Sequence, residues 1–403
     1  MPRTPRHTKA TPLLLKNLNE RTALETIRAG APISRAEISR RAGISKPTVS
    51  LALRSLVDAG LVREADHNPK GPSYGAVFFE PVAEAALVLG LDLGARFLRG
   101  AICDLNGVVR ARQDVELPRP DAEQALDAIP LLRRSLVEVT GLAEELLHEA
   151  VVGVPGVVHA AGESVHLATN VPGLEGRPFA AELRERLGLS VRLENDINLA
   201  ALGEQWLGVA RGIDDFVFLS IGTGLGAGIV LHGELHRGHH GAAGELDYAL
   251  GDFGEELDPS AGAVAALTAQ LALEDEAGTV LEPPYDTRAI FGAAREGDPL
   301  AQKVIAEIAR RIAYHVAPVA AVADVRLVVL GGGLGANSDF LLDPVRQRLG
   351  RWLPYPPRVE VSSLGDAAVL TGALAIGLRT ALDNVFVNRG TRARGAVVGS
   401  ADG

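Results

Sequence analysis

The sequence predicts a winged helix-turn-helix over residues 1–82, followed by an α/β body of two similar halves over residues 83–383. Three observations favour this fold class. The first 80 residues are basic with helical spacing of apolar residues, strand and helix patterns alternate after them, and a block of strands around a glycine-rich turn occurs twice. The 403 residues suffice for two or three folded units. Few apolar residues follow residue 383, which favours a disordered tail over 384–403.

The head begins with a helix at 18–28 and a second, shorter helix after it. Residues 18–28 place leucine, alanine and isoleucine at helical spacing, and Gly30 ends that pattern. Ser34 precedes Glu37 at the spacing of a reciprocal capping pair, in which each side chain bonds the other residue's backbone N–H. Gly43 then ends the second helix.

A third helix is predicted from its cap Ser45 to about Ala59. Pro47 falls in the first turn, where no backbone N–H is needed, and Gly60 suits the left-handed position after the end. The expected apolar stripe consists of Val49, Leu53, Leu56 and Val57.

The polar face of this third helix fits a DNA-reading role. In a helix-turn-helix, the first turns of the second short helix contact base edges in the major groove. The DNA-contacting residues that we predict are Arg35, Lys46, Thr48, Ser50 and Arg54, with Lys70 in a basic wing between two strand-like segments, 61–64 and 76–80. The plain alternative is a three-helix bundle with an exposed polar face.

Charge is distributed unevenly along the chain. Residues 1–75 contain 13 Lys and Arg against six Asp and Glu, whereas the whole chain has a net charge of −10. A basic head on an acidic body favours contact between the head and a polyanion such as double-stranded operator DNA.

The expected location is cytoplasmic and associated with the nucleoid, without a membrane partner. No uninterrupted apolar run reaches the ~18 residues that span a bilayer, and the N-terminus lacks the apolar core of a signal peptide. The single cysteine, Cys103, can form neither an internal disulfide nor a cysteine zinc site by itself, so we expect it to pack in the core.

The body begins with a strand pattern that returns later. Residues 86–117 indicate strands interrupted by a glycine turn and by Asn106-Gly107, a strong hairpin signal. Residues 214–238 repeat the order of strand, glycine-rich turn, strand and hairpin, so we interpret the two blocks as a duplicated unit. A last helix is expected over 366–378.

Three glycine-rich turns, at 92–94, 222–226 and 331–333, each follow a predicted strand. Backbone N–H groups at such turns can approach phosphate. One glycine after a strand is usually only a turn, but three in this order are a stronger indication. The candidate contacts to a nucleotide phosphate are Asp92, Gly94, Gly222, Thr223 and Gly224.

With these motifs the chain resembles the ROK family, named for repressors, open reading frames and kinases. The resemblance covers about residues 15–380, and its most specific segments are SRAEISRRAGISKPTVS, LENDINLAALGE, IGTGLGAGIVLHGELHRGHHGAAGE and VVLGGGLG. It implies an actin-like body of the sugar-kinase type, with a ribonuclease H-like fold and a sugar between two lobes. The winged head, absent from the simple kinases, implies a sugar-responsive transcription factor.

The resemblance also implies a sugar site. Asn195 and Asp196 match the family's sugar-binding pair, and in kinase members this aspartate is the general base, so Asp196 is catalytic only if the chain is a kinase. Glu245 matches a glutamate that contacts sugar hydroxyls. The other expected effector contacts are Gly156, Thr169, Asn170 and Tyr248. Without the family context, Asn-Asp between strand and helix is as readily a helix cap.

Departures from the family pattern bear on cofactors. Tyr248 stands where the family has a histidine that binds zinc, and GDFGEELDPSAG replaces the cysteine-rich zinc loop, so we expect no structural zinc and no other metal. Kinases place a small hydroxyl residue and a lysine after the first phosphate turn, whereas this chain has Ala95-Arg96-Phe97. This weakens the case for ATP, which we expect only if kinase activity is retained.

The leading hypothesis is a sugar-responsive regulator that represses genes of carbohydrate uptake or metabolism. It would act as a homodimer or homotetramer, because one winged helix reads only a few base pairs. Two alternatives stay open. One is an ATP-dependent, glucokinase-like sugar kinase with an accessory DNA-binding head, and the other is a scaffold whose body only dimerises the head.

Overall fold

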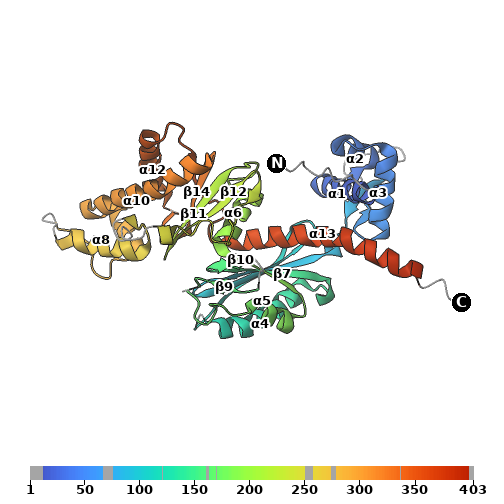
Figure 1. Cartoon of the computed structure of the whole chain (residues 1–403), viewed down its shortest axis with the longest axis horizontal. Coiled ribbons are helices and arrows are strands. Elements are labelled where there is room, and N and C mark those ends of the chain that lie inside the picture. Colours follow the sequence, from blue (N-terminus) through green and yellow to red (C-terminus); the bar gives the residue numbers. More distant parts are fainter. Residues whose placement is uncertain are drawn as a thin grey trace, which may run out of the picture.

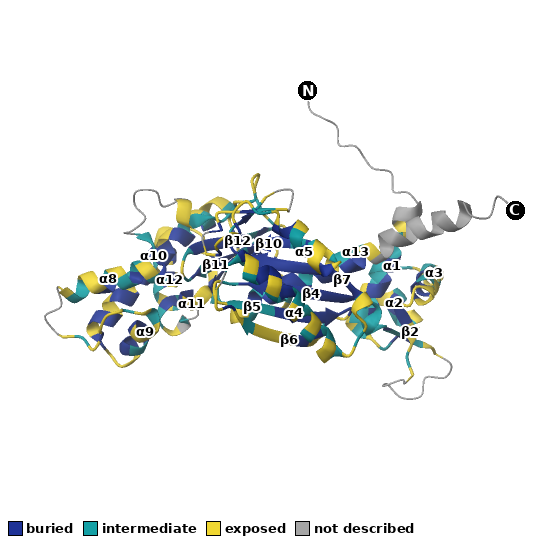
Figure 2. Cartoon of the chain, turned by 90° about the horizontal axis from the view of Figure 1, so that it is seen from below, coloured by how far each residue is buried: buried dark blue, intermediate teal, exposed yellow. Residues whose placement is uncertain are grey.

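The computed structural model describes residues 12–66, 76–119, 121–159, 163–168, 170–249, 257–273, 278–335 and 337–398. The chain forms a small head and two lobes, with the long helix α13 (Ala368–Val398) running across the first lobe towards the head (Figure 1). Buried residues concentrate in the two sheets and beneath the helices that cover them, as Figure 2 shows.

The head is a winged helix-turn-helix, as predicted. Its helices are α1 (Pro12–Gly30), α2 (Arg35–Ala42) and α3 (Lys46–Asp58). Its sheet has the order β1-β3-β2 and comprises β1 (Ile33–Ser34), β2 (Val62–Glu64) and β3 (Phe78–Pro81). The two-residue strand β1 was not expected, since two residues carry no alternation to detect. The wing residue Lys70 lies outside the described residues.

The predicted helix caps are present, with one change. The side chains of Ser34 and Ser45 accept hydrogen bonds from the backbone N–H groups three residues later, at 3.3 Å each. The carboxylate of Glu37, however, binds Arg40 and Arg41 at 2.5–2.8 Å rather than completing the reciprocal pair. Two guanidinium groups outcompete one neutral backbone donor, because bonds between charged groups are stronger.

The first lobe contains a five-stranded sheet of order β10-β7-β4-β5-β6. These strands are β4 (Leu87–Leu93), β5 (Phe97–Asp104), β6 (Val109–Glu116), β7 (Leu147–Val154) and β10 (Ser190–Asn195). Helices α4 (Ala122–Thr140) and α5 (Phe179–Leu187) cover one face. The smaller elements are η1 (Ala83–Ala85), η2 (Glu144–Leu146), β8 (Val157–Val158) and β9 (Val165–His166).

The second lobe contains a sheet of order β13-β12-β11-β14-β15. Its strands are β11 (Phe216–Ile221), β12 (Leu225–Leu231), β13 (Glu234–Leu235), β14 (Leu327–Gly331) and β15 (Arg358–Val361). Its helices are α8 (Ala261–Leu273), α9 (Thr287–Arg295), α10 (Pro299–Ala323), α11 (Gly332–Gly335) and α12 (Ser338–Trp352), with the short turns η3 (Leu246–Ala249) and η5 (Gly365–Ala367).

The two sheets have the same topology, which confirms the predicted duplication. In each, the first strand lies in the centre, the next two are antiparallel on one side, and the last two are parallel on the other. Asn106-Gly107 and His232-Gly233 form the corresponding hairpin turns, with both glycines and His232 at positive φ. Each fifth strand is followed by a helix, α6 (Asp196–Leu207) after β10 and α13 after β15.

Helices α6 and α13 pack at very close range. A side chain at Gly372 would overlap the carbonyl oxygen of Leu199, and one at Gly203 would overlap that of Ala368. Only glycine permits such an approach of two backbones. The two lobes are therefore joined through the helices that follow their fifth strands.

The head shares an apolar cluster with the body. Leu24 and Ile27 of α1 belong to the same buried cluster as Cys103 of β5 and Leu374 and Leu378 of α13. Cys103 thus packs in the core, as expected. The head is therefore packed against α13 and β5 of the body through apolar side chains.

Helix α13 is longer than the sequence indicated. We expected a helix over 366–378 and a tail from 384, whereas the helix continues to Val398. Once formed, a helix extends at one hydrogen bond per added residue, and the alanine and arginine residues here favour it. Within the described residues, one helical stretch is long and apolar enough to cross a membrane: 365–384, formed by η5 and the first part of α13. Of that stretch 56% is buried, as in a core helix of a globular fold.

Candidate functional site

The predicted sugar pair lies at the start of α6. Asn195 ends β10 and caps α6, since its Oδ1 accepts a hydrogen bond from the Asn198 N–H at 2.9 Å. Its Nδ2 donates to the carbonyl oxygen of Gly156 at 2.9 Å. Asn195 is 8% exposed. The helix-cap interpretation of this pair is therefore correct, and it leaves the expected sugar role open.

The structure brings Gly156 to Asn195 and fixes its backbone. Gly156 has a φ of 102°, and a Cβ there would lie 2.6 Å from the carbonyl oxygen of His166. Glu175 holds the facing loop by accepting a hydrogen bond from the Ala168 N–H at 3.1 Å. Of the other two predicted residues on this wall, Asn170 is exposed and Thr169 lies outside the described residues.

Two predicted carboxylates act electrostatically on a third, Asp196. Burial, together with the negative charges of Asp92 and Glu245, raises the pKa of Asp196 to about 7. Burial also raises the pKa of Glu245, with Asp247 adding to the shift. A carboxyl group that titrates near neutral pH can both accept and donate a hydrogen bond. This matches the needs of a hydroxyl-rich ligand.

The sequence did not predict a half-buried ion pair beside Asn195, between the buried Glu194 and the more exposed Arg237. Arg237 donates to Glu194 Oε2 from Nε at 2.9 Å and from Nη2 at 2.6 Å. Glu194 Oε1 accepts from the Asn198 side chain at 3.1 Å and the Asn195 N–H at 3.2 Å. The pair joins β10 of the first lobe to the loop after β13 of the second. Both residues belong to motifs that resemble the family, but their pairing across 43 positions has no local signal.

The first predicted phosphate turn, at 92–94, makes its hydrogen bonds to other groups of the protein. Burial raises the pKa of Asp92 to about 6, opposed by Arg99, which donates to Asp92 Oδ2 at 3.1 Å. The guanidinium groups of Arg96 and Arg99 lie 5.3 and 5.6 Å from the ring centre of Phe97. The Gly94 N–H donates to the Phe97 carbonyl oxygen at 2.9 Å. That N–H is thus already paired within the protein.

The second phosphate turn binds a carboxylate of the same chain. Asp247 Oδ1 accepts a hydrogen bond from the Leu225 N–H at 2.8 Å, and a Cβ at Gly224 would lie 2.6 Å from its Oδ2. Thr223 is exposed and Gly222 half-buried. The carboxyl group of Asp247 therefore occupies the turn that we predicted to face phosphate. Like charges repel, which disfavours a nucleotide here.

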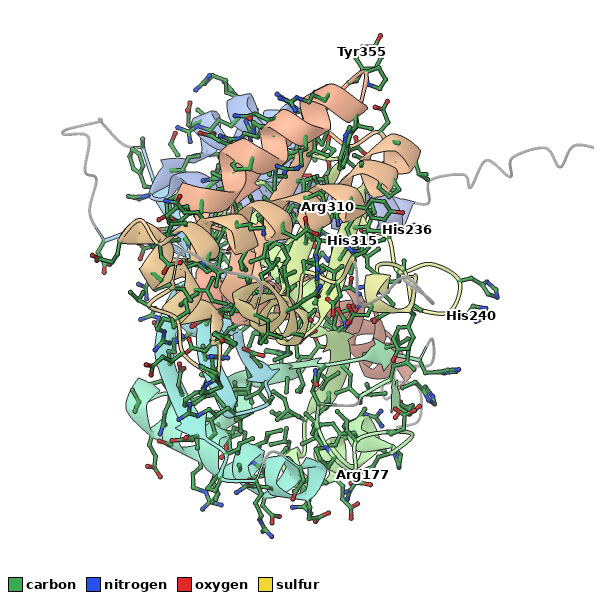
Figure 3. The ribbon with its side chains drawn as sticks, turned by 90° about the vertical axis from the view of Figure 1, so that its left-hand side faces the viewer. Arg177, His236, His240, Arg310, His315 and Tyr355 are labelled. Carbon is green, nitrogen blue, oxygen red and sulfur yellow. The ribbon has the colours of Figure 1, made fainter. Side chains whose placement is uncertain are left out.

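Tyr248 and the histidines of the loop before it, among them His236 and His240, lie towards solvent. Tyr248 is 60% exposed, at the rim rather than inside the site. Figure 3 shows His240 pointing outward from its loop, with His236 at the same edge of the molecule. In the part of the chain that the structure describes, no three His, Cys, Asp or Glu side chains gather closely enough to hold a metal ion. Residues 250–256 lie outside that part, so the expected lack of zinc stays a prediction.

The described residues predicted to contact DNA belong to α2 and α3 of the head. Arg35, Lys46 and Arg54 are exposed, while the hydroxyls of Thr48 and Ser50 are half-buried and bond to Ser45 Oγ at 2.7 Å and to the Lys46 carbonyl oxygen at 3.0 Å. The buried stripe of α3 is Val49, Ala52, Leu53 and Leu56. Val57, which we placed in the stripe, is 41% exposed because the helix turns it outward, and Leu51, which we did not select, is 64% exposed.

Comparison with known proteins accords with this architecture. Residues 88–380 match the ROK family and residues 17–70 match the MarR family. The xylose repressor of Caldicellulosiruptor bescii is 26% identical over 90% of this chain and 96% of its own length. A glucokinase of Streptomyces coelicolor is 31% identical over 71% of this chain and 96% of its own length.

A solved structure shares the whole architecture, head included. The crystal structure of a ROK family transcriptional regulator, a homolog of the Escherichia coli MLC protein, aligns with a TM-score of 0.77 at 23% identity, covering 93% of this chain and 98% of that one. The family pattern extends from β4 into α13 and so takes in both lobes. The chain belongs to the ROK family.

Proposed function

We propose that this protein is a sugar-responsive, DNA-binding transcriptional regulator that represses genes of carbohydrate uptake or metabolism. The observation that supports this most directly is the presence, in one chain, of a helix-turn-helix with exposed basic residues on α3 and of amide and carboxyl side chains that suit a hydroxyl-rich ligand. A relative named as a xylose repressor extends over 90% of the chain, head and body together. The repressor interpretation therefore accounts for both units.

The effector site we propose centres on Asn195, Asp196 and Glu245. Asn195 presents an amide, and the two carboxyl groups have raised pKa values that suit bonds to neutral hydroxyls. Gly156 would form the wall opposite, and the exposed Tyr248 would contact only a ligand that extends to the rim. Because one relative that spans head and body is named as a xylose repressor, an aldopentose is the first effector to test.

The effect of sugar binding would be transmitted to the head through α6 and α13. Asn195 caps the N-terminus of α6, and the glycine contacts at Gly203 and Gly372 hold α6 against α13. Helix α13 in turn bears on α1, where Arg21 bonds to Asp383 at 2.5 Å. A ligand changes DNA affinity only to the extent that it binds two arrangements differently. We propose that the two arrangements differ in how α1 packs against α13.

The partners follow from the head. One recognition helix covers few base pairs, so we propose a cytoplasmic homodimer or homotetramer that places two heads one DNA turn apart, on a symmetric operator.

The test is a DNA mobility shift with the region upstream of the protein's own gene. We expect a shifted band that responds to D-xylose or another sugar of a panel, with the response lost in Asp196→Asn while the shift itself persists. A matched control is Asp127→Asn, an exposed aspartate on α4, which should leave both unchanged. Failure to shift any upstream DNA, with or without sugars, would overturn the proposal.

The alternative function is an ATP-dependent sugar kinase. It is favoured by the pKa of Asp196, about 7, which suits a general base, and by the glucokinase at 31% identity. Against it are the internal carboxylate at the second phosphate turn and the Arg99 bond at the first. An ADP-release assay over hexoses, pentoses and N-acetylated amino sugars tests this alternative. Turnover that Asp196→Asn abolishes would support a kinase. No turnover with any of these sugars would rule out the kinase function.

A further inference from the structure

A pocket lies where the head meets the body, between α1, α6 and α13. Its volume is about 350 Å³, within the range of small-molecule sites. Arg21 and Arg28 contribute from the head, Trp206 from α6, and Ile376, Arg379 and Leu382 from α13. The pocket is remote from the sugar residues, since α6 has 12 residues and spans roughly 18 Å from Asp196 to its other end.

Among the residues that line the pocket, three arginines face one carboxylate, Glu25. The carboxylates of Asp383, Glu234 and Asp104 act on these arginines without lining the pocket. Arg21 is already paired, at 3.0 Å to Glu25 and 2.5 Å to Asp383. Arg379 and Glu234 lie 3.9 Å apart, at the long end of ion-pair distances.

Arg28 is the least satisfied of the three arginines. Its Nε is buried and has no hydrogen-bond partner within the described ranges. Burial is also the main reason that its pKa is lowered. A buried cationic donor without a partner is costly, and an anionic oxygen bonds a guanidinium in a fixed, two-pronged geometry.

The other wall of the pocket is apolar. Trp206, Ile376 and Leu382 line it, and the indole of Trp206 packs over the turn at Gly107. Ile376 and Leu382 are already buried, whereas Trp206 is half-buried. A bare inorganic ion would leave the exposed part of the indole against water, whereas an aliphatic body would cover it.

We propose that this pocket binds a small organic anion, a carboxylate with a branched aliphatic body. Its carboxylate pairs with Arg28 and Arg379, and its body packs on Trp206 and Ile376. Such a ligand touches α1 of the head and both central helices of the body at once. It therefore holds the head against the body and acts as a second effector, separate from the sugar.

Tryptophan fluorescence tests the proposal on the full-length protein. The chain has two tryptophans, so Trp352→Phe leaves Trp206 as the only reporter. We expect 4-methylpentanoate to change the Trp206 emission saturably, and 4-methylpentanamide and inorganic phosphate to give no saturable change. Arg28→Met should weaken binding of the carboxylate at least about tenfold, as loss of a charge-assisted bond does.

Two further variants keep the test decisive. Arg379→Gln alters a more exposed arginine of the same pocket and should also weaken binding if Arg28→Met fails to fold. Arg134→Met removes an exposed arginine on α4 and should change nothing. Equal responses to the carboxylate and its amide, saturation by phosphate alone, or unchanged affinity in both pocket variants would each overturn the proposal.

Discussion

The two lobes share one topology but end in helices of different length and contact. Helix α6 follows the fifth strand of the first lobe, is capped by Asn195 and ends after 12 residues. Helix α13 follows the fifth strand of the second lobe, runs for 31 residues and contacts the head. The shared part of the two helices forms the contact between the lobes. Helix α13 contacts α1 both in this shared part, through the cluster of Leu374 and Leu378, and in its additional length, where Asp383 bonds to Arg21.

The largest effect should come from breaking the contact that the two helices share. Gly372→Val drives a branched side chain into the Leu199 carbonyl, so we expect a loss of about 3 kcal/mol in the free energy of unfolding, measured by urea denaturation. Gly292→Ala on α9 is the matched control, since a Cβ there meets nothing within 4 Å, and it should stabilise by ~0.5 kcal/mol. Equal stability of the two variants would contradict the close packing of the α6 and α13 backbones at Gly372.

A second, smaller effect should come from the side chain that anchors α6 to the second lobe. Glu204 is fully buried and accepts hydrogen bonds from Ser362 Oγ at 2.6 Å, the Val209 N–H at 2.9 Å and the Leu364 N–H at 3.2 Å. Glu204→Ala leaves these donors unpaired, which should cost about 2 kcal/mol. Glu145→Ala, at an exposed position, should stay within ~0.5 kcal/mol of wild type in the same denaturation series.

Local chemistry explains what the sequence could predict. Ser34, Ser45 and Asn195 cap helices through bonds to residues three positions away, and Gly107 turns a hairpin, so a short window contains the whole signal. The alternation of strands and turns likewise revealed both halves of the body.

Features that depend on pairing between distant residues could not be predicted from the sequence. Arg237 meets Glu194, and Asp247 meets Leu225, only because the two lobes and their loops fold against each other. The glycines of α6 and α13 read as ordinary helix positions until the helices are seen in contact. Sequence reasoning found the types of side chain in the site, but not the partners that set their charge and position.

The pH dependence of stability should report on Asp196, at the N-terminus of α6. Asp196 has a pKa of about 7 in the folded protein, above its ordinary value near 3.8. Between these two values the unfolded chain has released the proton that the folded chain keeps, so this group reduces stability as pH rises from about 4 to 7. We expect Asp196→Asn to gain stability relative to wild type across that window and to hold a constant difference above it. Parallel stability curves would contradict the raised pKa.

The smallest change in stability, and the most informative for output, concerns the α13 end. Asp383→Ala removes the bond to Arg21 between α13 and α1, where both side chains are more than one-third exposed, so unfolding should change by less than ~1 kcal/mol and even less at high salt. Glu80→Ala removes a comparable exposed pair with Arg63 inside the head. We expect both variants to shift DNA, but only Asp383→Ala to reduce the response to sugar. If both respond to sugar like the wild type, the ion pair does not connect α13 to the head's output, and the apolar contacts of Leu374 and Leu378 would have to do so alone.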